Sequence, residues 1–413
     1  MSELDFAAAR QRLAGVIKET PLERSDRLSE AAGFPVLLKR EDLQRCRSFK
    51  VRGAYNAIAA MSPEQRSRGV VAASAGNHAQ GVAFACNDLG VEGQIFLPSN
   101  TPRQKRNRIA EIGGPWVEQV IVDGNFDLAS ARAQLHAMET RANFVHPFDD
   151  PHVIAGQGTV AQEILAAAGS EGIDTVLVPV GGGGLLAGIA AWFAQNAPQT
   201  RVVGVEPAGA ASMQAALAAG RPVELDRVDN FVDGTAVARV GSRSYEIVAG
   251  LEIPFVTVPE GAVCSELLDL YHADGVIAEP AGALASAALR IGLPFTPQGP
   301  VVCVVSGGNN DLSRYDEIAE RSARYQGLRH YFIVRFQQQP GALRYFLDEV
   351  LGPDDDIVLF EYTKKNNRET GPALVGIELA DPADIHGLRK RIDASPVHVE
   401  EIPGESDLFR LLI

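Results

Sequence analysis

The stretch that decides the fold is Thr175-Val176-Leu177-Val178-Pro179-Val180-Gly181-Gly182-Gly183-Gly184-Leu185. Residues 176–180 are apolar without alternation, which is typical of a strand buried on both faces of a parallel sheet. Four glycines follow, and then a segment of helical character that reaches Asn196. A buried strand, a glycine turn and a helix together indicate an α/β protein.

The same unit recurs along most of the chain. Short β-branched runs predict strands at Val36–Lys39, Val70–Ala73, Gln94–Leu97, Gln119–Val122, Thr175–Val180, Arg201–Val205 and Val301–Val305. Alanine-rich segments between them predict helices at Ala79–Leu89, Leu128–Thr140, Gly158–Ala168 and Leu185–Asn196. Because this region is large for one open sheet, we predict a doubly wound architecture of two α/β lobes with a cleft between them. Sites in such sheets lie beyond the carboxyl ends of the strands.

The pattern changes near Arg321–Gly327. Strand and helix candidates then follow in the order βαββαβ, which is that of a ferredoxin-like unit. They are His330–Phe336, Pro340–Leu351, Ile357–Thr363, Ala373–Leu379, Ile385–Ile392 and Val397–Glu401. We therefore predict two domains, residues 1–325 and 326–413, of which the second has no nucleophile cluster and binds a ligand.

Composition restricts the function. The chain has 413 residues and a net charge of −14, which argues against a nucleic-acid partner. The acidic N-terminus is unlike a signal peptide, and no apolar stretch is long enough to span a bilayer. The four cysteines stand far apart without C-x-x-C spacing, so we expect reduced thiols in a cytoplasmic protein.

One lysine has unusual neighbours, in Ser48-Phe49-Lys50-Val51-Arg52-Gly53-Ala54. Lysine can hold an aldehyde cofactor as a Schiff base, most readily when its surroundings lower its pKa. Taken alone, the stretch favours an ordinary surface lysine at the start of a helix, because lysine is rarely buried.

The loop Ser74-Ala75-Gly76-Asn77-His78 follows a predicted strand and precedes a predicted helix. Its small residues let a ligand approach the backbone, and amide groups at a helix start favour an anion such as a carboxylate. The alternative is a plain asparagine turn, with a structural role for His78.

The second loop, Gly181–Leu185, suits a phosphate group, because glycines at a helix start expose backbone amides. Gly182, Gly184 and Ala187 also satisfy G-x-G-x-x-A, and Glu206 follows at the spacing of a dinucleotide fingerprint. A nicotinamide enzyme would normally place that motif in its first βαβ unit, whereas many residues precede it here.

The third loop is Ser306-Gly307-Gly308-Asn309-Asn310, after the predicted strand Val301–Val305. A serine hydroxyl at a strand end can face a ring nitrogen as donor or acceptor. A tight Gly-Gly turn would explain the glycines but not the serine.

Together, the lysine and the three loops resemble the pyridoxal-phosphate (PLP) enzymes of the tryptophan-synthase-β fold, fold type II. Within them the chain is similar to the threonine dehydratases, or threonine ammonia-lyases. The resemblance runs from about residue 20 to 320. The matching segments are Lys39–Gln44, Ser48–Ala54, Ser74–Gly81, Gly181–Leu185, Glu279–Ala283 and Ser306–Asp311.

The resemblance implies a role for each matched residue. Lys50 would hold PLP as a Schiff base, with Phe49 packed beside the ring. Asn77 would bond the phenolic oxygen of the ring, and Ser306 would meet the pyridine nitrogen. The amides of Gly181, Gly182, Gly183, Gly184 and Leu185 would hold the phosphate. The loop containing Ser74, Ala75, Gly76 and His78 would bind the substrate carboxylate.

The implied reaction is the deamination of L-threonine to 2-oxobutanoate and ammonia, the first step of isoleucine biosynthesis. Lys50 would remove the α-proton, after which the β-hydroxyl leaves. A serine at position 306, unlike an aspartate, would not keep the pyridine nitrogen protonated, which favours prompt elimination. L-Serine is a further expected substrate.

Two residues depart from the related serine racemases. Those enzymes carry a serine where this chain has Ala75, and alanine cannot act as a second base. They also hold a divalent ion with a glutamate and an aspartate, where this chain has Glu206 and Ser212. We therefore predict no divalent-metal site, although a monovalent ion stays open.

The C-terminal unit has its own resemblance. Arg335-Phe336, Pro340–Leu343 and Phe360–Asn367 are similar to the ACT-like regulatory domain of biosynthetic threonine dehydratases. That implies inhibition by isoleucine, relieved by valine, and a homotetramer or a dimer. This chain has one such unit where longer enzymes have two. The alternative for this unit is a domain that serves only assembly. The alternatives for the whole protein are a broader serine/threonine dehydratase with a catabolic role and a non-catalytic sensor.

Overall fold

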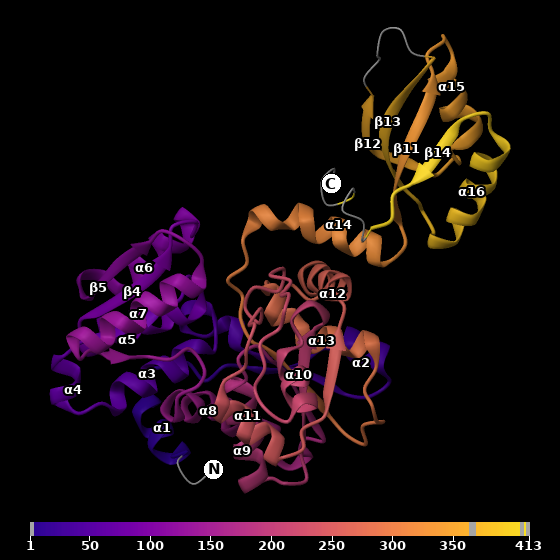
Figure 1. Cartoon of the computed structure of the whole chain (residues 1–413). Helices are drawn as coiled ribbons and strands as arrows, with labels where there is room; N and C mark the ends of the chain where they lie inside the picture. Colours follow the sequence, from indigo (N-terminus) through magenta and orange to yellow (C-terminus); the bar gives the residue numbers. More distant parts are fainter. Residues whose placement is uncertain (1–3, 363–368, 405–408, 410–413) are drawn as a thin grey trace. The chain divides into compact units, whose positions relative to one another are not determined.

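The structure is a computed structural model that describes residues 4–362, 369–404 and 409. The chain divides into two compact units, Met1–Ser313 and Arg314–Ile413, each drawn in Figure 1. The predicted boundary after residue 325 would instead assign helix α14 (Tyr315–Tyr325) to the first unit. No described helix is both long and apolar enough to cross a membrane.

The first unit contains two sheets. The larger has the order β1-β2-β10-β7-β8-β9 and the smaller the order β5-β4-β3-β6. Their bounds are β1 (Leu22–Arg24), β2 (Val36–Arg40), β3 (Val70–Ala73), β4 (Gly93–Pro98), β5 (Val117–Val122), β6 (Asn143–Phe144), β7 (Thr175–Pro179), β8 (Arg201–Pro207), β9 (Phe255–Val258) and β10 (Val301–Val305). Every neighbouring pair is parallel except β1 and β2. The predicted two-lobed α/β architecture is confirmed.

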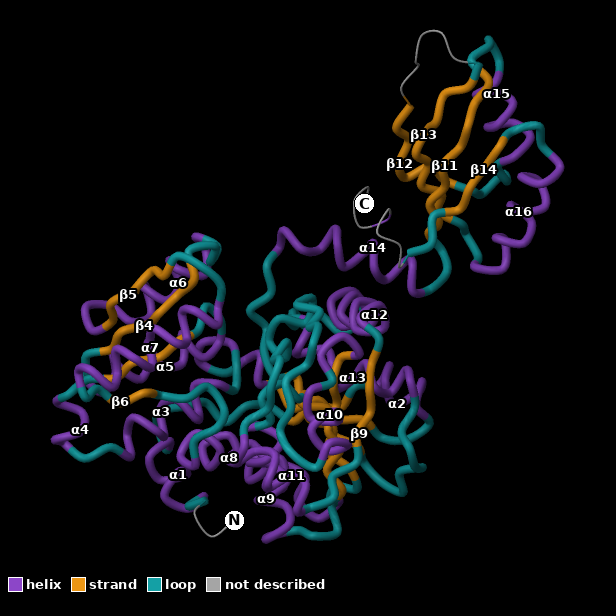
Figure 2. Tube along the Cα trace, viewed as in Figure 1, coloured by secondary structure: helices purple, strands orange, loops and turns teal. Residues whose placement is uncertain are grey.

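Helices lie around both sheets, as Figure 2 shows. Their bounds are α1 (Phe6–Leu13), α2 (Asp26–Ala32), α3 (Lys50–Ala60), α4 (Pro63–Ser67), α5 (Asn77–Leu89), α6 (Arg103–Gly113), α7 (Phe126–Thr140), α8 (Pro151–Ala168), α9 (Gly184–Asn196), α10 (Ser212–Ala219), α11 (Ser242–Gly250), α12 (Glu260–His272) and α13 (Pro280–Ile291). Helix α8 begins before its predicted start at Gly158, because Asp150 caps it by accepting from the amides of His152 and Val153.

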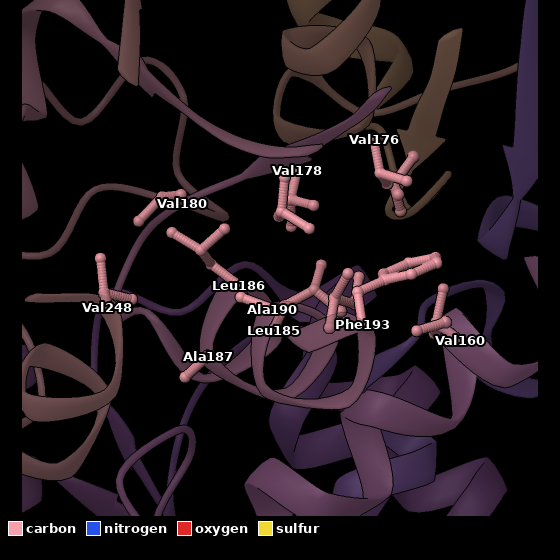
Figure 3. Packing of buried hydrophobic residues seen from close by; sticks show 14 of the residues in the cluster. Val160, Val176, Val178, Val180, Leu185, Leu186, Ala187, Ala190, Phe193 and Val248 are labelled. Carbon is pink, nitrogen blue, oxygen red and sulfur yellow. The ribbon is translucent and has the colours of Figure 1, made fainter. Parts of the chain in front are cut away.

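The decisive stretch of sequence forms the centre of the larger lobe. Val176 and Val178 of β7 pack with Leu186 and Phe193 of α9 in a buried apolar cluster (Figure 3). Helix α9 is apolar on nearly all sides and is buried along most of its length, as expected for a helix enclosed in a core. This packing fixes the glycine turn between β7 and α9 at the end of the sheet.

Helices α3, α8 and α9 are packed closely through glycines. A Cβ at Gly156 of α8 would lie 2.7 Å from the carbonyl oxygen of Arg52 in α3, and one at Gly188 of α9 would overlap the carbonyl oxygen of Ile154 in α8. Glycine is therefore required at both positions for the backbones to approach this closely. Because α3 begins at Lys50 and α9 follows the glycine turn, the stack joins two segments of the predicted site.

A balanced set of charges is buried between β2, α3 and α8. Arg52 and Glu41 are both 0% exposed, and their side chains pair at 2.8 Å. Glu163 of α8 accepts from Arg52 at 2.6 Å and also pairs with the buried Lys39 at 2.6 Å. Two cations face two carboxylates, so each buried charge has a partner, as burial requires.

The second unit is a four-stranded antiparallel sheet of order β12-β13-β11-β14, with bounds β11 (Arg329–Gln337), β12 (Asp356–Tyr362), β13 (Thr370–Glu378) and β14 (His398–Glu401). Buried apolar residues from these strands pack with others from α15 (Ala342–Tyr345), the π-helical turn Phe346–Val350 and α16 (Ile385–Ala394). The predicted ferredoxin-like order is confirmed.

The predicted helix Pro340–Leu351 is wrong at its start, because Gly341 has a φ of 92° and helical backbone begins after it. Thr363 and the run Lys364–Asn367 lie outside the described residues.

Candidate active site

A cavity of about 890 Å³ in the first unit is lined by loops from both sheets. Every site residue predicted from the sequence lies on its wall: Phe49, Lys50, Ser74, Ala75, Gly76, Asn77, His78, Gly181, Gly182, Gly183, Gly184, Leu185 and Ser306. These residues come from the start of α3 and from the carboxyl ends of β3, β7 and β10. The structure therefore gathers the whole predicted set in one place, as parallel-sheet topology leads us to expect.

The backbone ahead of Lys50 is held by the loop after β10. The amide of Phe49 donates to the carbonyl of Ser306 at 3.2 Å, and the amide of Gly308 donates to the carbonyl of Arg47 at 2.9 Å. Cys46 and Arg47 have φ values of 58° and 53°, a left-handed backbone that is uncommon outside glycine. Such backbone persists only where surrounding contacts hold it, and this loop supplies them.

Lys50 is anchored inside the cavity. Its Nζ donates to the carbonyl oxygen of Pro147 at 3.0 Å and lies 5.3 Å from the centre of the Phe49 ring. Burial lowers the pKa of the Lys50 ammonium to about 8, and the nearby Glu279 carboxyl opposes that shift. Near neutral pH this lysine is consequently an uncharged amine far more often than an ordinary lysine is, and the uncharged amine is the form that attacks an aldehyde.

The glycine turn fits the phosphate of PLP. Within the described part of the chain, the amides of Gly181, Gly182, Gly183 and Leu185 have no hydrogen-bond acceptor, and they stand at the start of α9. Free amides at a helix start bind anions. The turn also leaves no room for side chains, because a Cβ at Gly182 would overlap the ring of Phe148. The residues present therefore suit the cofactor.

Asn77 is held from two sides. Its Nδ2 donates to Glu279 Oε1 at 2.6 Å, and its Oδ1 accepts from Asn309 Nδ2 at 2.8 Å. Burial raises the pKa of the Glu279 carboxyl to about 7; Asp233 adds to the rise, while Asn77 and Lys105 oppose it. Glu279 and Asn309 both line the cavity. Both lie within the matched segments Glu279–Ala283 and Ser306–Asp311, but the sequence alone assigns neither of them a role.

His78 is a neutral side chain. Its Nε2 lies 2.9 Å from the carbonyl oxygen of Val145, and burial lowers the pKa of its imidazole to about 3. It therefore offers a substrate carboxylate no positive charge. Ser74 Oγ accepts from the amide of Gly76 at 3.2 Å, while Ala75 contributes only a methyl group to the wall.

Ser306 is buried at the end of β10, and its Oγ donates to the carbonyl oxygen of Ala281 at 3.1 Å. Its lone pairs can accept from a protonated ring nitrogen, and rotation of the hydroxyl would let it donate to an unprotonated one. Its role toward the pyridine nitrogen remains a prediction.

Sequence reasoning missed contacts between residues far apart in the chain. Pro147, which accepts from Lys50, belongs to a loop in which His146 Nδ1 accepts from the amides of Phe148 and Asp149. Lys105 of α6 pairs with Asp233 at 3.1 Å, and both line the cavity. No local sequence pattern identifies these residues, because their role in the site depends on which loops lie next to each other in the folded chain.

The Glu206 region is occupied by protein contacts. Glu206 is buried and accepts from the amides of Met213 and Gln214 at the start of α10, at 2.7 and 3.0 Å. Burial raises the pKa of this carboxyl to about 7. Within the described ranges no three His, Cys, Asp or Glu side chains form a metal-binding group. The absence of a divalent-metal site stays a prediction.

Comparison with known proteins agrees with this geometry. Residues 13–307 match the family described as pyridoxal-phosphate dependent enzyme, so the fold and the site define a PLP enzyme of fold type II. Residues 320–412 match the C-terminal regulatory domain of threonine dehydratase. The chain belongs to the biosynthetic L-threonine dehydratase family.

The relatives that show this membership match over nearly their full length. The chain is 54% identical to L-threonine dehydratase biosynthetic IlvA of Mycobacterium tuberculosis, covering 100% of this chain and 96% of the relative. It is 50% identical to the protein of the same name from Bacillus subtilis, covering 98% and 96%. The processed form of threonine deaminase isoform 2 from Solanum lycopersicum is 38% identical with a TM-score of 0.72, covering 76% of this chain and 92% of that one.

Proposed function

We propose that this chain deaminates L-threonine to 2-oxobutanoate and ammonia by β-elimination of water, the first step of isoleucine biosynthesis. The observation that carries the proposal is Lys50, an amine with a lowered pKa, in a cavity that also contains the free amides of the glycine turn. The names of the full-length relatives support L-threonine as the substrate.

The bound cofactor supplies an electron sink for the charge left when the α-proton departs. The residues of this chain supply binding, orientation and proton transfer. Lys50 holds the cofactor covalently and, when free, takes the α-proton on Nζ. The amides of Gly181 to Leu185 bind the phosphate, Asn77 donates to the phenolic oxygen and Ser306 faces the ring nitrogen. The backbone of Ser74–His78 binds the substrate carboxylate without a charged side chain.

Adding L-threonine to the purified holoenzyme should produce 2-oxobutanoate and ammonia in equal amounts. L-Serine, tested in parallel, should react with a lower kcat/KM, as expected of an enzyme whose main substrate is L-threonine. Ala75 has no proton to exchange, so L-serine should not yield D-serine and L-threonine should not yield its Cα epimer, D-allo-threonine. Oxoacid from neither amino acid would contradict the catalytic proposal, and a clear preference for serine would favour the broader catabolic dehydratase.

We further propose that isoleucine inhibits the enzyme by binding the second unit, with valine relieving the inhibition. A cavity of about 460 Å³ lies there, and its walls include the aromatic side chains Phe336, Phe360 and Tyr362 together with the loop around Gly341. Phe336 meets the Tyr362 ring edge-on, with 5.8 Å between ring centres. Aromatic walls beside exposed backbone suit a small apolar amino acid.

Tyr362→Ala should raise the isoleucine concentration for half-inhibition by about tenfold or more, because it removes one aromatic wall of this cavity. Tyr345→Ala is the matched control. Tyr345 is 39% exposed and Tyr362 37%, but Tyr345 does not line the cavity. Inhibition curves at fixed L-threonine give the result. Equal effects of the two substitutions would contradict this location, and activity indifferent to isoleucine in the unchanged enzyme would contradict the regulation.

We also propose that the enzyme acts in the cytoplasm, which its free cysteines support. The family resemblance leads us to propose that it assembles as a homotetramer. Light scattering of the purified holoenzyme would measure the mass of the assembly, and a monomer would contradict this part of the proposal.

A further inference from the structure

We propose that Asn309 and Glu279 are positioning residues that fix the side-chain amide of Asn77, so that its nitrogen faces the bound cofactor. The proposal rests on PLP binding in this cavity, as the proposed function requires. An asparagine amide has nearly the same shape when its oxygen and nitrogen are exchanged, so shape alone does not choose the orientation. Hydrogen bonds to neighbouring residues must therefore determine the orientation of this amide.

The orientation of the Asn77 amide is fixed first by a group that can only accept hydrogen bonds, the backbone carbonyl of Cys46. Asn309 Nδ2 lies 2.7 Å from the backbone carbonyl oxygen of Cys46 and 2.8 Å from Asn77 Oδ1. A backbone carbonyl only accepts, so Asn309 must present its nitrogen to Cys46. The same nitrogen then faces Asn77 and can only donate to it. Asn77 must therefore present its oxygen to Asn309.

Glu279 reinforces the same orientation. Its Oε1 accepts from Asn77 Nδ2 at 2.6 Å, which uses one of the two hydrogens on that nitrogen. The second hydrogen is left for the cavity, which Asn77 lines. A reversed Asn77 would set its oxygen against the carboxylate of Glu279 and its nitrogen against the nitrogen of Asn309. Protonation of Glu279 would relieve only the first clash, so Asn309 decides the orientation at any pH.

The fixed orientation of Asn77 determines how it meets the phenolic oxygen of the bound cofactor. With its orientation fixed, Asn77 offers a donor to an anionic or accepting oxygen beside the ring. A reversed amide would place a carbonyl oxygen there and repel it. The polarity of this contact is thus transmitted from the Cys46 carbonyl through Asn309 to Asn77, and Cys46 is itself held in left-handed backbone.

The test replaces the donor by an acceptor of the same shape. Asn309→Asp would put a carboxylate oxygen against the Cys46 carbonyl and against Asn77 Oδ1, which reverses Asn77. We expect the PLP dissociation constant of the apoprotein to rise about ten- to hundredfold, the scale of a buried hydrogen bond turned into a mismatch. The visible absorption of the bound cofactor should also shift. Both are measured without substrate, so they do not depend on threonine turnover.

Asn310→Asp is the matched control, because it adds the same charge one residue away. Asn310 Nδ2 has no hydrogen-bond partner among the described residues, and Asn310 does not line the cavity. We expect its PLP affinity to stay within about threefold of the unchanged protein. Asn309→Ala removes the donor without adding repulsion, and its PLP affinity should fall between those of the two aspartate substitutions.

Two results would overturn the proposal. One is an Asn309→Asp variant that binds PLP as well as the Asn309→Ala variant does. The other is an equal loss of PLP affinity in the Asn309→Asp and Asn310→Asp variants. Far-ultraviolet circular dichroism identifies a variant that does not fold, in which case the comparison of Asn309→Ala with Asn310→Asp decides.

Discussion

Lys50→Ala is expected to lower the turnover of L-threonine by about a thousandfold or more and to abolish the visible absorption of the lysine-bound cofactor. Two functions are lost together. In the proposed function the lysine binds the cofactor covalently and its amine is the base for the α-proton, a contribution of roughly 10²–10⁴ in rate by itself. The contact between Nζ and the Pro147 carbonyl places this amine inside the cavity.

Lys105→Ala is the control for that experiment. Lys105 also lines the cavity, but its ammonium pairs with Asp233 and has no proposed part in proton transfer. Initial rates of 2-oxobutanoate formation and absorption spectra of both variants, saturated with PLP, give the comparison. A Lys50→Ala enzyme that keeps either its turnover or its lysine-dependent absorption would show that another lysine holds the cofactor.

Arg52→Met is expected to lower the free energy of unfolding by about 3–5 kcal/mol, because it breaks a buried ion pair and leaves one charge without its partner. Glu41 is 0% exposed and its carboxylate pairs with Arg52. Glu163 keeps Lys39 after the substitution, whereas Glu41 keeps only the hydroxyl of Thr20 as a side-chain partner among the residues that the structure describes. Methionine fills much of the arginine's volume, so the cost is mainly electrostatic.

Arg108→Met provides the comparison at the surface. Arg108 pairs with Glu111 on α6, with exposed fractions of 45% and 70%, and such pairs contribute about 0–1 kcal/mol. Urea unfolding of both variants, with PLP at a fixed concentration, measures the difference. Glu41→Gln added to Arg52→Met should recover part of the loss, since no buried charge is then unpaired. Equal destabilisation by the two single substitutions would refute the argument.

Much of the fold follows from local patterns in the sequence. The apolar runs at Val70–Ala73 and Val301–Val305 form strands with the predicted bounds, because burial on both faces leaves a clear signal. Strands β1, β6 and β9 were not predicted, because each lies at an edge of its sheet and none is buried along its whole length, so none leaves a continuous apolar run. Helix α15 starts later than predicted because Gly341 adopts left-handed backbone, which a sequence does not display.

The site also contains residues that local sequence patterns predict and residues that only the folded structure identifies. Its predicted residues meet in one cavity because the ends of parallel strands lie together, while their individual roles remain proposals. Glu279 and Asn309 had no role in the sequence analysis, because their importance comes from hydrogen bonds to a residue some two hundred positions away. A carboxyl whose pKa rises through burial looks like any other glutamate until its surroundings are known.

The glycine contacts among α3, α8 and α9 have a consequence for how this enzyme can vary. In the proposed function Lys50 binds one part of the cofactor and the turn before α9 binds another, so the thickness of the helix stack would set the distance between these two binding elements. Gly156 does not line the cavity, yet a single methyl group there would increase this distance. Constraint on sequence change should therefore extend well outside the cavity, along the helix that separates the reactive lysine from the phosphate.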